Sequence, residues 1–284
     1  MKWKTRHLEE AVMKFLMVCS FGLIAAALGL ILITVLIKGL PALSLNMITQ
    51  TPKGGYYLGK EGGVLNAIIG SLYLAGGGTL IALLIAFPTA LFLNTYLERN
   101  TWADKVRLAL DILWGIPSIV YGAFGFTLML AMGLRASLLG GIITLACLEF
   151  PIMTRAMDEV IRRIPRDLHL AAYALGSTQL ETALGVITRQ VLPGILTAVL
   201  LAFGRGIGDA ASVLFTAGYT DRIPDSLLSP VASLPLAVFF QLGTAFPEVQ
   251  QRAYASALIL TALVLGISLF SRWISERLNK YSIR

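Results

Sequence analysis

The sequence carries little charge for its length, and this scarcity excludes most kinds of soluble protein. Only 14% of the 284 residues are Asp, Glu, Lys or Arg, whereas soluble globular domains contain about 25%. Hydrophobic residues make up 56%, and the mean hydropathy is +0.76. Such a composition excludes a cytosolic enzyme, a disordered chain and a disulfide-rich secreted fold. It predicts an all-α membrane protein with several transmembrane helices.

Cysteine and histidine are also scarce, which removes the usual material for metal and nucleophilic sites. The two cysteines, Cys19 and Cys147, lie inside apolar runs and have no zinc-binding or disulfide spacing. Of the two histidines, His7 falls in the N-terminal tail and His169 in a polar segment that we expect to be a loop. We therefore expect no catalytic residue, no metal site and no cofactor site.

Six apolar runs are long enough to be transmembrane helices. They cover residues 11–37, 66–95, 108–133, 136–153, 191–219 and 253–274. The first run is about twice as long as the core of a signal peptide, so we expect a retained helix over 11–38. Pro117 and Pro151 lie inside the third and fourth runs and are expected to bend or break them.

The basic residues predict the orientation of the chain. Six spans put both ends on one side, and most Lys and Arg residues fall on that side. By the positive-inside rule, both ends face the cytoplasm, which makes 1–10 and 275–284 cytoplasmic tails. The net charge of +7 is then explained by contact with anionic membrane lipid and not by nucleic acid. We expect a multi-pass protein of a bacterial cytoplasmic (inner) membrane.

The fifth run contains a charged pair, Arg205 and Asp209, within the sequence Gly-Arg-Gly-Ile-Gly-Asp. A charged residue at the centre of a membrane helix costs about 2.5–3.5 kcal/mol on insertion scales. Residues four apart share one helix face, so the two can neutralise each other, and the glycines leave that face bare. Three interpretations are open: an ion pair that orients the bundle, a water-lined surface unrelated to substrate, or an anion pathway. In the pathway, Arg205 binds a phosphate-like oxyanion and Asp209 holds Arg205 when the site is empty.

Two further acidic residues, Asp111 and Glu149, lie in or near apolar runs. For Asp111 we favour an interfacial or capping role. Glu149 is either a pathway residue or pairs with a neighbouring helix. The chain has no Walker A motif, so any ATP hydrolysis has to occur in a partner subunit.

The segment 155–190 is too polar to span the membrane. Residues 167–185 show an amphipathic helix followed by a turn, and Gly176 is placed to close that helix. Its few bulky side chains favour docking into a partner protein over lying on the membrane.

This cytoplasmic segment resembles the EAA-type loop of ABC-importer permeases. That loop contains Glu-Ala-Ala, three further residues and then Gly, and the chain has Ala171, Ala172 and Gly176 at the matching places. Leu170 stands where the family has Glu, and a Pro that the family carries downstream is missing after Ile187.

Within these permeases the chain resembles the PstA family of phosphate permeases over about 61–274. The matching positions are Glu61-Gly62-Gly63, Asp111-Ile112-Leu113, Pro117-Ser118-Ile119-Val120, Arg205, and Leu234-Pro235. Asp209 replaces the family's Glu and keeps its charge. The resemblance implies that Arg205 and Asp209 line the substrate pathway, with Glu149, Asp111 and Ser118 as possible pathway or gating residues.

The resemblance also implies an architecture and a set of partners. The fold would be that of a type I ABC importer permease, with five helices over 61–274 and a segment at about 160–190 that couples to the ATPase through Ala171, Ala172 and Gly176. The partners would be a PstC-like second permease, two PstB-like ATPase subunits and a PstS-like extracytoplasmic phosphate-binding protein. The chain itself would be no enzyme. It would pass phosphate by alternating access while a separate subunit hydrolyses ATP.

Two alternatives stay open. One is a permease for another oxyanion, such as molybdate, tungstate or sulfate, because the stretch after Arg205 departs from the PstA pattern. The other is a non-transporting membrane scaffold in which Arg205 and Asp209 are only a structural pair.

Overall fold

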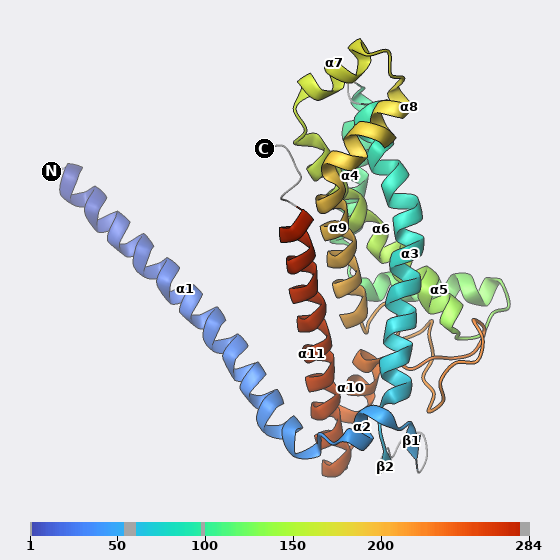
Figure 1. Cartoon of the computed structure of the whole chain (residues 1–284). Helices are drawn as coiled ribbons and strands as arrows, with labels where there is room; N and C mark the ends of the chain where they lie inside the picture. Colours follow the sequence, from blue (N-terminus) through green and yellow to red (C-terminus); the bar gives the residue numbers. More distant parts are fainter. Residues whose placement is uncertain (1, 54–60, 98–99, 279–284) are drawn as a thin grey trace.

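The computed structural model describes residues 2–53, 61–97 and 100–278, and these form a helical bundle (Figure 1). A pair of two-residue antiparallel strands, β1 (Pro52–Lys53) and β2 (Glu61–Gly62), is the one sheet within that part of the chain. Residues 279–284 of the expected C-terminal tail, and Met1 of the N-terminal tail, lie outside the described residues. The all-α prediction is therefore confirmed.

The helices follow one another with short connections, except before α10. Their bounds are α1 (Lys2–Gly39), η1 (Leu40–Ala42), α2 (Leu45–Thr49), α3 (Leu65–Thr95), α4 (Thr101–Gly115), α5 (Ser118–Ala131), α6 (Leu138–Arg162), α7 (Arg166–Ala174), α8 (Gln179–Glu181), η2 (Thr182–Ile187), α9 (Thr188–Gly208), α10 (Leu234–Leu242) and α11 (Pro247–Leu278).

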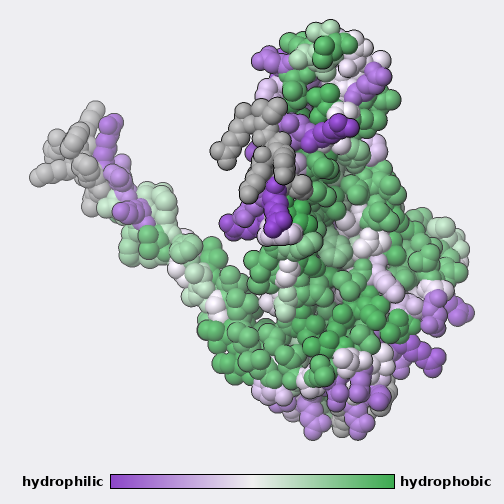
Figure 2. Space-filling view, viewed as in Figure 1, coloured by the Kyte–Doolittle hydropathy of each residue, from purple (hydrophilic) through white to green (hydrophobic). Residues whose placement is uncertain are grey.

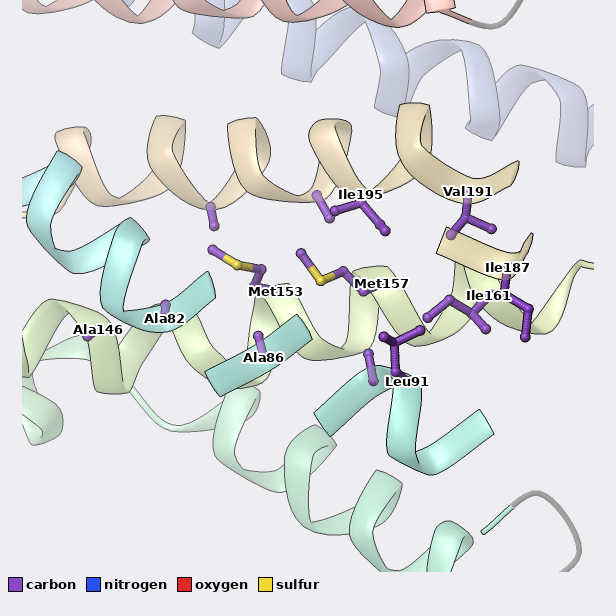
Figure 3. Close-up of a cluster of buried hydrophobic side chains, with 13 residues drawn as sticks. Ala82, Ala86, Leu91, Ala146, Met153, Met157, Ile161, Ile187, Val191 and Ile195 are labelled. Atoms are coloured by element: carbon purple, nitrogen blue, oxygen red, sulfur yellow. The ribbon is translucent and has the colours of Figure 1, made fainter. Parts of the chain in front are cut away.

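The core lies where α3, α6 and α9 pack together. Figure 3 shows Ala82 and Ala86 of α3 beside Met153 and Met157 of α6, with Ile195 of α9 on the other side. Small side chains on α3 let the helix backbones approach closely, and the flexible methionines fill the remaining space. Helix α6 is the most enclosed of the candidate spans, with 72% of its apolar window buried, whereas α1 has 0% buried.

The apolar helices agree with the six predicted spans. Five helical segments are long and apolar enough to cross a membrane, and the bent pair α4 and α5 makes up to six. The two helices of that pair meet at 95° around Pro117, as predicted. Pro151, in contrast, does not break its helix. Helix α6 continues through Pro151 to Arg162 because its flanking turns are held by close packing against α3 and α9.

Several expected boundaries are wrong, among them the start of the first helix, which was expected at residue 11 and lies at Lys2. The fourth run was expected to end at 153, yet α6 extends to Arg162 and includes the start of the segment predicted to be polar and extramembrane. The fifth run was expected to reach 219, yet α9 ends at Gly208 and an irregular stretch follows to α10. The residues that follow α9 up to 219 are mostly apolar, like α9 itself, so hydropathy alone does not locate the end of α9.

The two ends of the bundle differ in what they carry. Helix α7, the start of α1 and the end of α11 lie toward one end, which we name the α7 end, and α2, β1, β2 and α10 lie at the other (Figure 1). Figure 2 shows a broad hydrophobic middle with hydrophilic side chains gathered toward both ends, as expected for a bilayer-spanning chain.

Candidate functional site

Arg205 lies in the last turn of α9, and its side chain is exposed on the surface of the chain. The guanidinium makes no hydrogen bond or ion pair with any residue that the structure describes. At Gly204 and Gly208, on either side, a Cβ atom would meet nothing within 4 Å. The helix surface around Arg205 is therefore bare, so a solute or a partner chain can reach the guanidinium.

The expectation that Asp209 shares a helix face with Arg205 is wrong. Helix α9 ends at Gly208, and Asp209 has extended backbone angles (φ −83°, ψ 121°). Its Oδ1 accepts hydrogen bonds from the backbone N–H groups of Ala211 at 2.9 Å and Ser212 at 3.3 Å. Asp209 thus caps the turn that follows α9 and makes no ion pair with Arg205 among the described residues.

Glu149 of α6 lies directly beneath the end of α9. Its side chain is fully buried, and its Oε2 accepts a hydrogen bond from Thr79 Oγ1 of α3 at 2.7 Å. Its Oε1 has no hydrogen-bond partner in the described part of the chain and faces the backbone of Gly206, where a Cβ atom would collide with it.

The end of α9 therefore lies between a cationic side chain and a buried carboxyl group. The Arg205 guanidinium lies on the open side, and the Glu149 carboxyl lies on the packed side, with the Cβ-less Gly206 between them. The predicted pairing of Glu149 with a neighbouring helix is present through Thr79, which sequence reasoning did not single out. A buried carboxyl oxygen without a donor is costly, so its place beside an exposed arginine of the same span marks this region as the candidate site.

Asp111 and Ser118 lie elsewhere on the bent pair. Asp111 of α4 accepts hydrogen bonds from Arg155 of α6 at 2.6 Å and 3.3 Å, so it ties two helices together and does not act as a cap. Ser118 is half-buried at the first position of α5, beside the 95° corner. Neither residue contacts Arg205 among the interactions of the described residues.

A buried polar cluster near the α7 end was missed by sequence reasoning. Asp158 of α6 is fully buried and accepts hydrogen bonds from Asn94 at 2.8 Å, from Arg107 at 3.0 Å and 3.1 Å, and from Arg155 at 2.7 Å. These contacts join α3, α4 and α6. The spacing of Arg155 and Asp158, three apart on one helix, was the available signal.

Helix α7 projects from the bundle as the amphipathic helix that the sequence predicts. Ala172 is buried, Ala171 is exposed, and Gly176 closes the helix with φ +87°, a conformation that favours glycine. Leu170 and Leu175 are 64% and 88% exposed. His169 lies in α7 and not in a loop as expected. Within the described residues, no three His, Cys, Asp or Glu side chains gather to hold a metal ion.

The sequence of this chain is similar to those of known membrane transport proteins. Residues 86–280 match the family model described as binding-protein-dependent transport system inner membrane component. The phosphate transport system permease protein PstA of Haemophilus influenzae is 35% identical over 85% of this chain and 85% of its own length. PstA of Xylella fastidiosa is 35% identical over 84% of this chain and 83% of its own. The probable ABC transporter permease protein YqgI of Bacillus subtilis is 28% identical over 92% and 94%.

Solved structures share the architecture. A chain of the inward-facing MetNI methionine ABC transporter superposes with a TM-score of 0.62 at 16% identity, covering 75% of this chain and 95% of its own. A chain of a bacterial ABC transporter that imports alginate gives a TM-score of 0.52 at 14% identity, covering 75% and 79%. At such low identities these likenesses show the fold.

Proposed function

The chain belongs to the family of binding-protein-dependent transport system inner membrane components, and we propose that it moves inorganic phosphate across the cytoplasmic membrane as the permease subunit of an ABC importer. It is a multi-pass inner-membrane protein with the type I ABC importer permease fold. The observation that carries phosphate as the substrate is the 35% identity to PstA of Haemophilus influenzae over 85% of both chains.

The geometry of Arg205 supports an oxyanion substrate. Its guanidinium is exposed and unpaired among the described residues, at the end of an otherwise apolar helix. A planar fork of N–H donors suits the oxygens of phosphate. Because Asp209 is occupied by backbone N–H groups, it does not hold Arg205 at rest, and the guanidinium is free to meet an incoming anion.

Transport by this family needs an ATPase and a binding protein. We infer that the specific partners are a PstC-like permease, two PstB-like ATPases and a PstS-like phosphate-binding protein, and that ATP is hydrolysed by the PstB-like subunits and not by this chain. Helix α7, with Ala171, Ala172 and Gly176, would then dock into an ATPase. The exposed Leu170 and Leu175 beside it supply the apolar surface that such docking needs.

The orientation follows from the same assignment. We propose that the α7 end faces the cytoplasm, because Arg155, Arg162, Arg163 and Arg166 gather there. The α10 end would then face the binding protein.

Uptake by the reconstituted importer tests the proposal. The four kinds of subunit are placed in proteoliposomes with ATP inside, and uptake of radiolabelled phosphate is compared with uptake of sulfate and molybdate. Arg205→Ala should lower phosphate uptake about 10- to 100-fold, the value of one charge-assisted hydrogen-bond donor, while ATP hydrolysis continues. Arg272→Ala is the matched control, since Arg272 is an exposed arginine on α11 that pairs with Glu276.

Three results would contradict the proposal. Full phosphate uptake by Arg205→Ala would remove Arg205 from the pathway. Uptake of molybdate or sulfate in place of phosphate would assign the chain to another oxyanion, and no uptake of any anion by a correctly assembled complex would favour a scaffold.

A further inference from the structure

A second polar site lies away from Arg205, at the α7 end of the bundle. Here a pocket of about 290 Å³ opens where α4, α6 and α7 meet. Arg107 and Asp104 of α4 line it on one side, Arg162 of α6 on another, and Arg166 and His169 of α7 on the third. None of these residues belongs to the site at the end of α9.

The pocket has a cationic lining. Among the described residues that line it, Arg107 and Arg162 lie near one carboxylate, Asp104, which is 86% exposed and 3.4 Å from Arg107. The other partner of Arg107, Asp158, is buried behind it and is also shared with Arg155, so it contributes little negative charge to the pocket. Arg162 makes no hydrogen bond or ion pair with any residue that the structure describes.

We propose that this pocket binds a phosphate group, held by Arg162, Arg107 and His169. Guanidinium forks from two helices suit the oxygens of a phosphate group, and an imidazole adds a further donor. The volume is close to the lower limit of small-ligand pockets, so it accommodates one compact anion or one lipid headgroup. The proposal goes beyond the transport function, because it needs neither Arg205 nor passage of substrate.

The surroundings favour a lipid as the source of the phosphate group. Trp102 lies on the first turn of α4 together with Asp104, is 59% exposed, and has Lys105 Nζ 4.5 Å from its ring centroid. Tryptophan with a neighbouring lysine is typical of the level of the lipid headgroups. Basic pockets between membrane helices at this level suit anionic headgroups, and free phosphate shares the same chemistry.

A bound phosphate group would connect α7 to the bundle. Helix α7 packs mainly against η2 and has one buried residue, Ala172. An anion held jointly by His169 of α7, Arg107 of α4 and Arg162 of α6 would fix the angle of α7 against the spans. The anion would therefore strengthen the mechanical coupling between α7 and the membrane helices.

The test uses the assembled importer, purified and stripped of lipid. Binding of phosphatidylglycerol is measured by native mass spectrometry against phosphatidylcholine, and binding of radiolabelled inorganic phosphate is measured by equilibrium dialysis. The variants are Arg162→Gln and, as the matched control, Arg163→Gln. Arg163 is the next residue, is also exposed, and pairs with Glu159 outside the pocket. Both variants remove the same charge from the same turn.

Arg162→Gln should weaken binding of one probe about tenfold or more, while Arg163→Gln changes it less than twofold. Loss of phosphatidylglycerol binding identifies the lipid headgroup as the ligand, and loss of inorganic phosphate binding identifies the free ion; either supports the site. His169→Gln should weaken the same probe. Equal binding of both probes by Arg162→Gln and Arg163→Gln would overturn the proposal, because only Arg162 lines the pocket.

Discussion

Replacing Asp158 by Asn should destabilise the chain through the loss of one buried charge. Asp158 is fully buried and accepts four hydrogen bonds, from Asn94, Arg107 and Arg155. The substitution keeps the side-chain volume but leaves two guanidinium groups without their shared counter-charge. Removing one partner of a buried ion pair costs about 3–5 kcal/mol. Because Arg155 retains Asp111, we expect the lower end, about 3 kcal/mol.

The assay is the free energy of unfolding, measured by titrating the purified chain with SDS in mixed micelles. Glu159→Gln is the control, since Glu159 is the next residue and pairs with Arg163 at 3.1 Å on the surface. Exposed pairs of this kind contribute about 0–1 kcal/mol. A second check is the double variant Asp158→Asn with Arg107→Gln, whose cost should be less than the sum of the two single changes.

A loss below about 1 kcal/mol for Asp158→Asn, similar to that of Glu159→Gln, would refute the reasoning. It would mean that water or lipid headgroups solvate the cluster so well that burial of Asp158 does not strengthen its ion pairs.

Three further predictions concern the candidate site and α7. Gly206→Ala should cost about 1–3 kcal/mol of unfolding free energy because the new Cβ collides with Glu149, whereas Gly204→Ala, which meets nothing, should cost none; equal effects would show that α9 can shift. Thr79→Val should cost about 1–3 kcal/mol by leaving both Glu149 oxygens without a donor, measured in the same titration, and a neutral result would indicate that water enters. Gly176→Ala should strain a turn at φ +87° by about 1–2 kcal/mol and weaken association of the ATPase subunits in pull-down, while unchanged association would separate the closing of α7 from docking.

The membrane spans were predictable because long apolar runs have few alternatives in a bilayer. Pro117 also marked the corner of the bent pair correctly, since a proline removes a backbone donor where two helices can separate. Pro151 has the same local chemistry, yet α6 continues through it. The difference lies in tertiary packing on α3 and α9, which no local pattern contains.

The candidate site was predictable in its residues but not in its geometry. Arg205 stands out in any reading of the fifth run. The end of the helix at Gly208 is not visible in the sequence, because Asp209 can either continue a helix or cap the next turn. The hydrogen bonds from the backbone N–H groups of Ala211 and Ser212 to Asp209 select the cap. The contact between Glu149 and Thr79 joins residues 70 positions apart and depends entirely on how α3 meets α6.

The partial negative charge at the C-terminal end of α9 weakens the attraction of Arg205 for an anion. The final carbonyl groups of a helix carry a partial negative charge of about half an electron, and Arg205 lies within that last turn. Part of the guanidinium's attraction is therefore already offset by its own helix. If Arg205 lines the substrate pathway, as we propose, an oxyanion there would meet less than a full positive charge and would leave the site quickly.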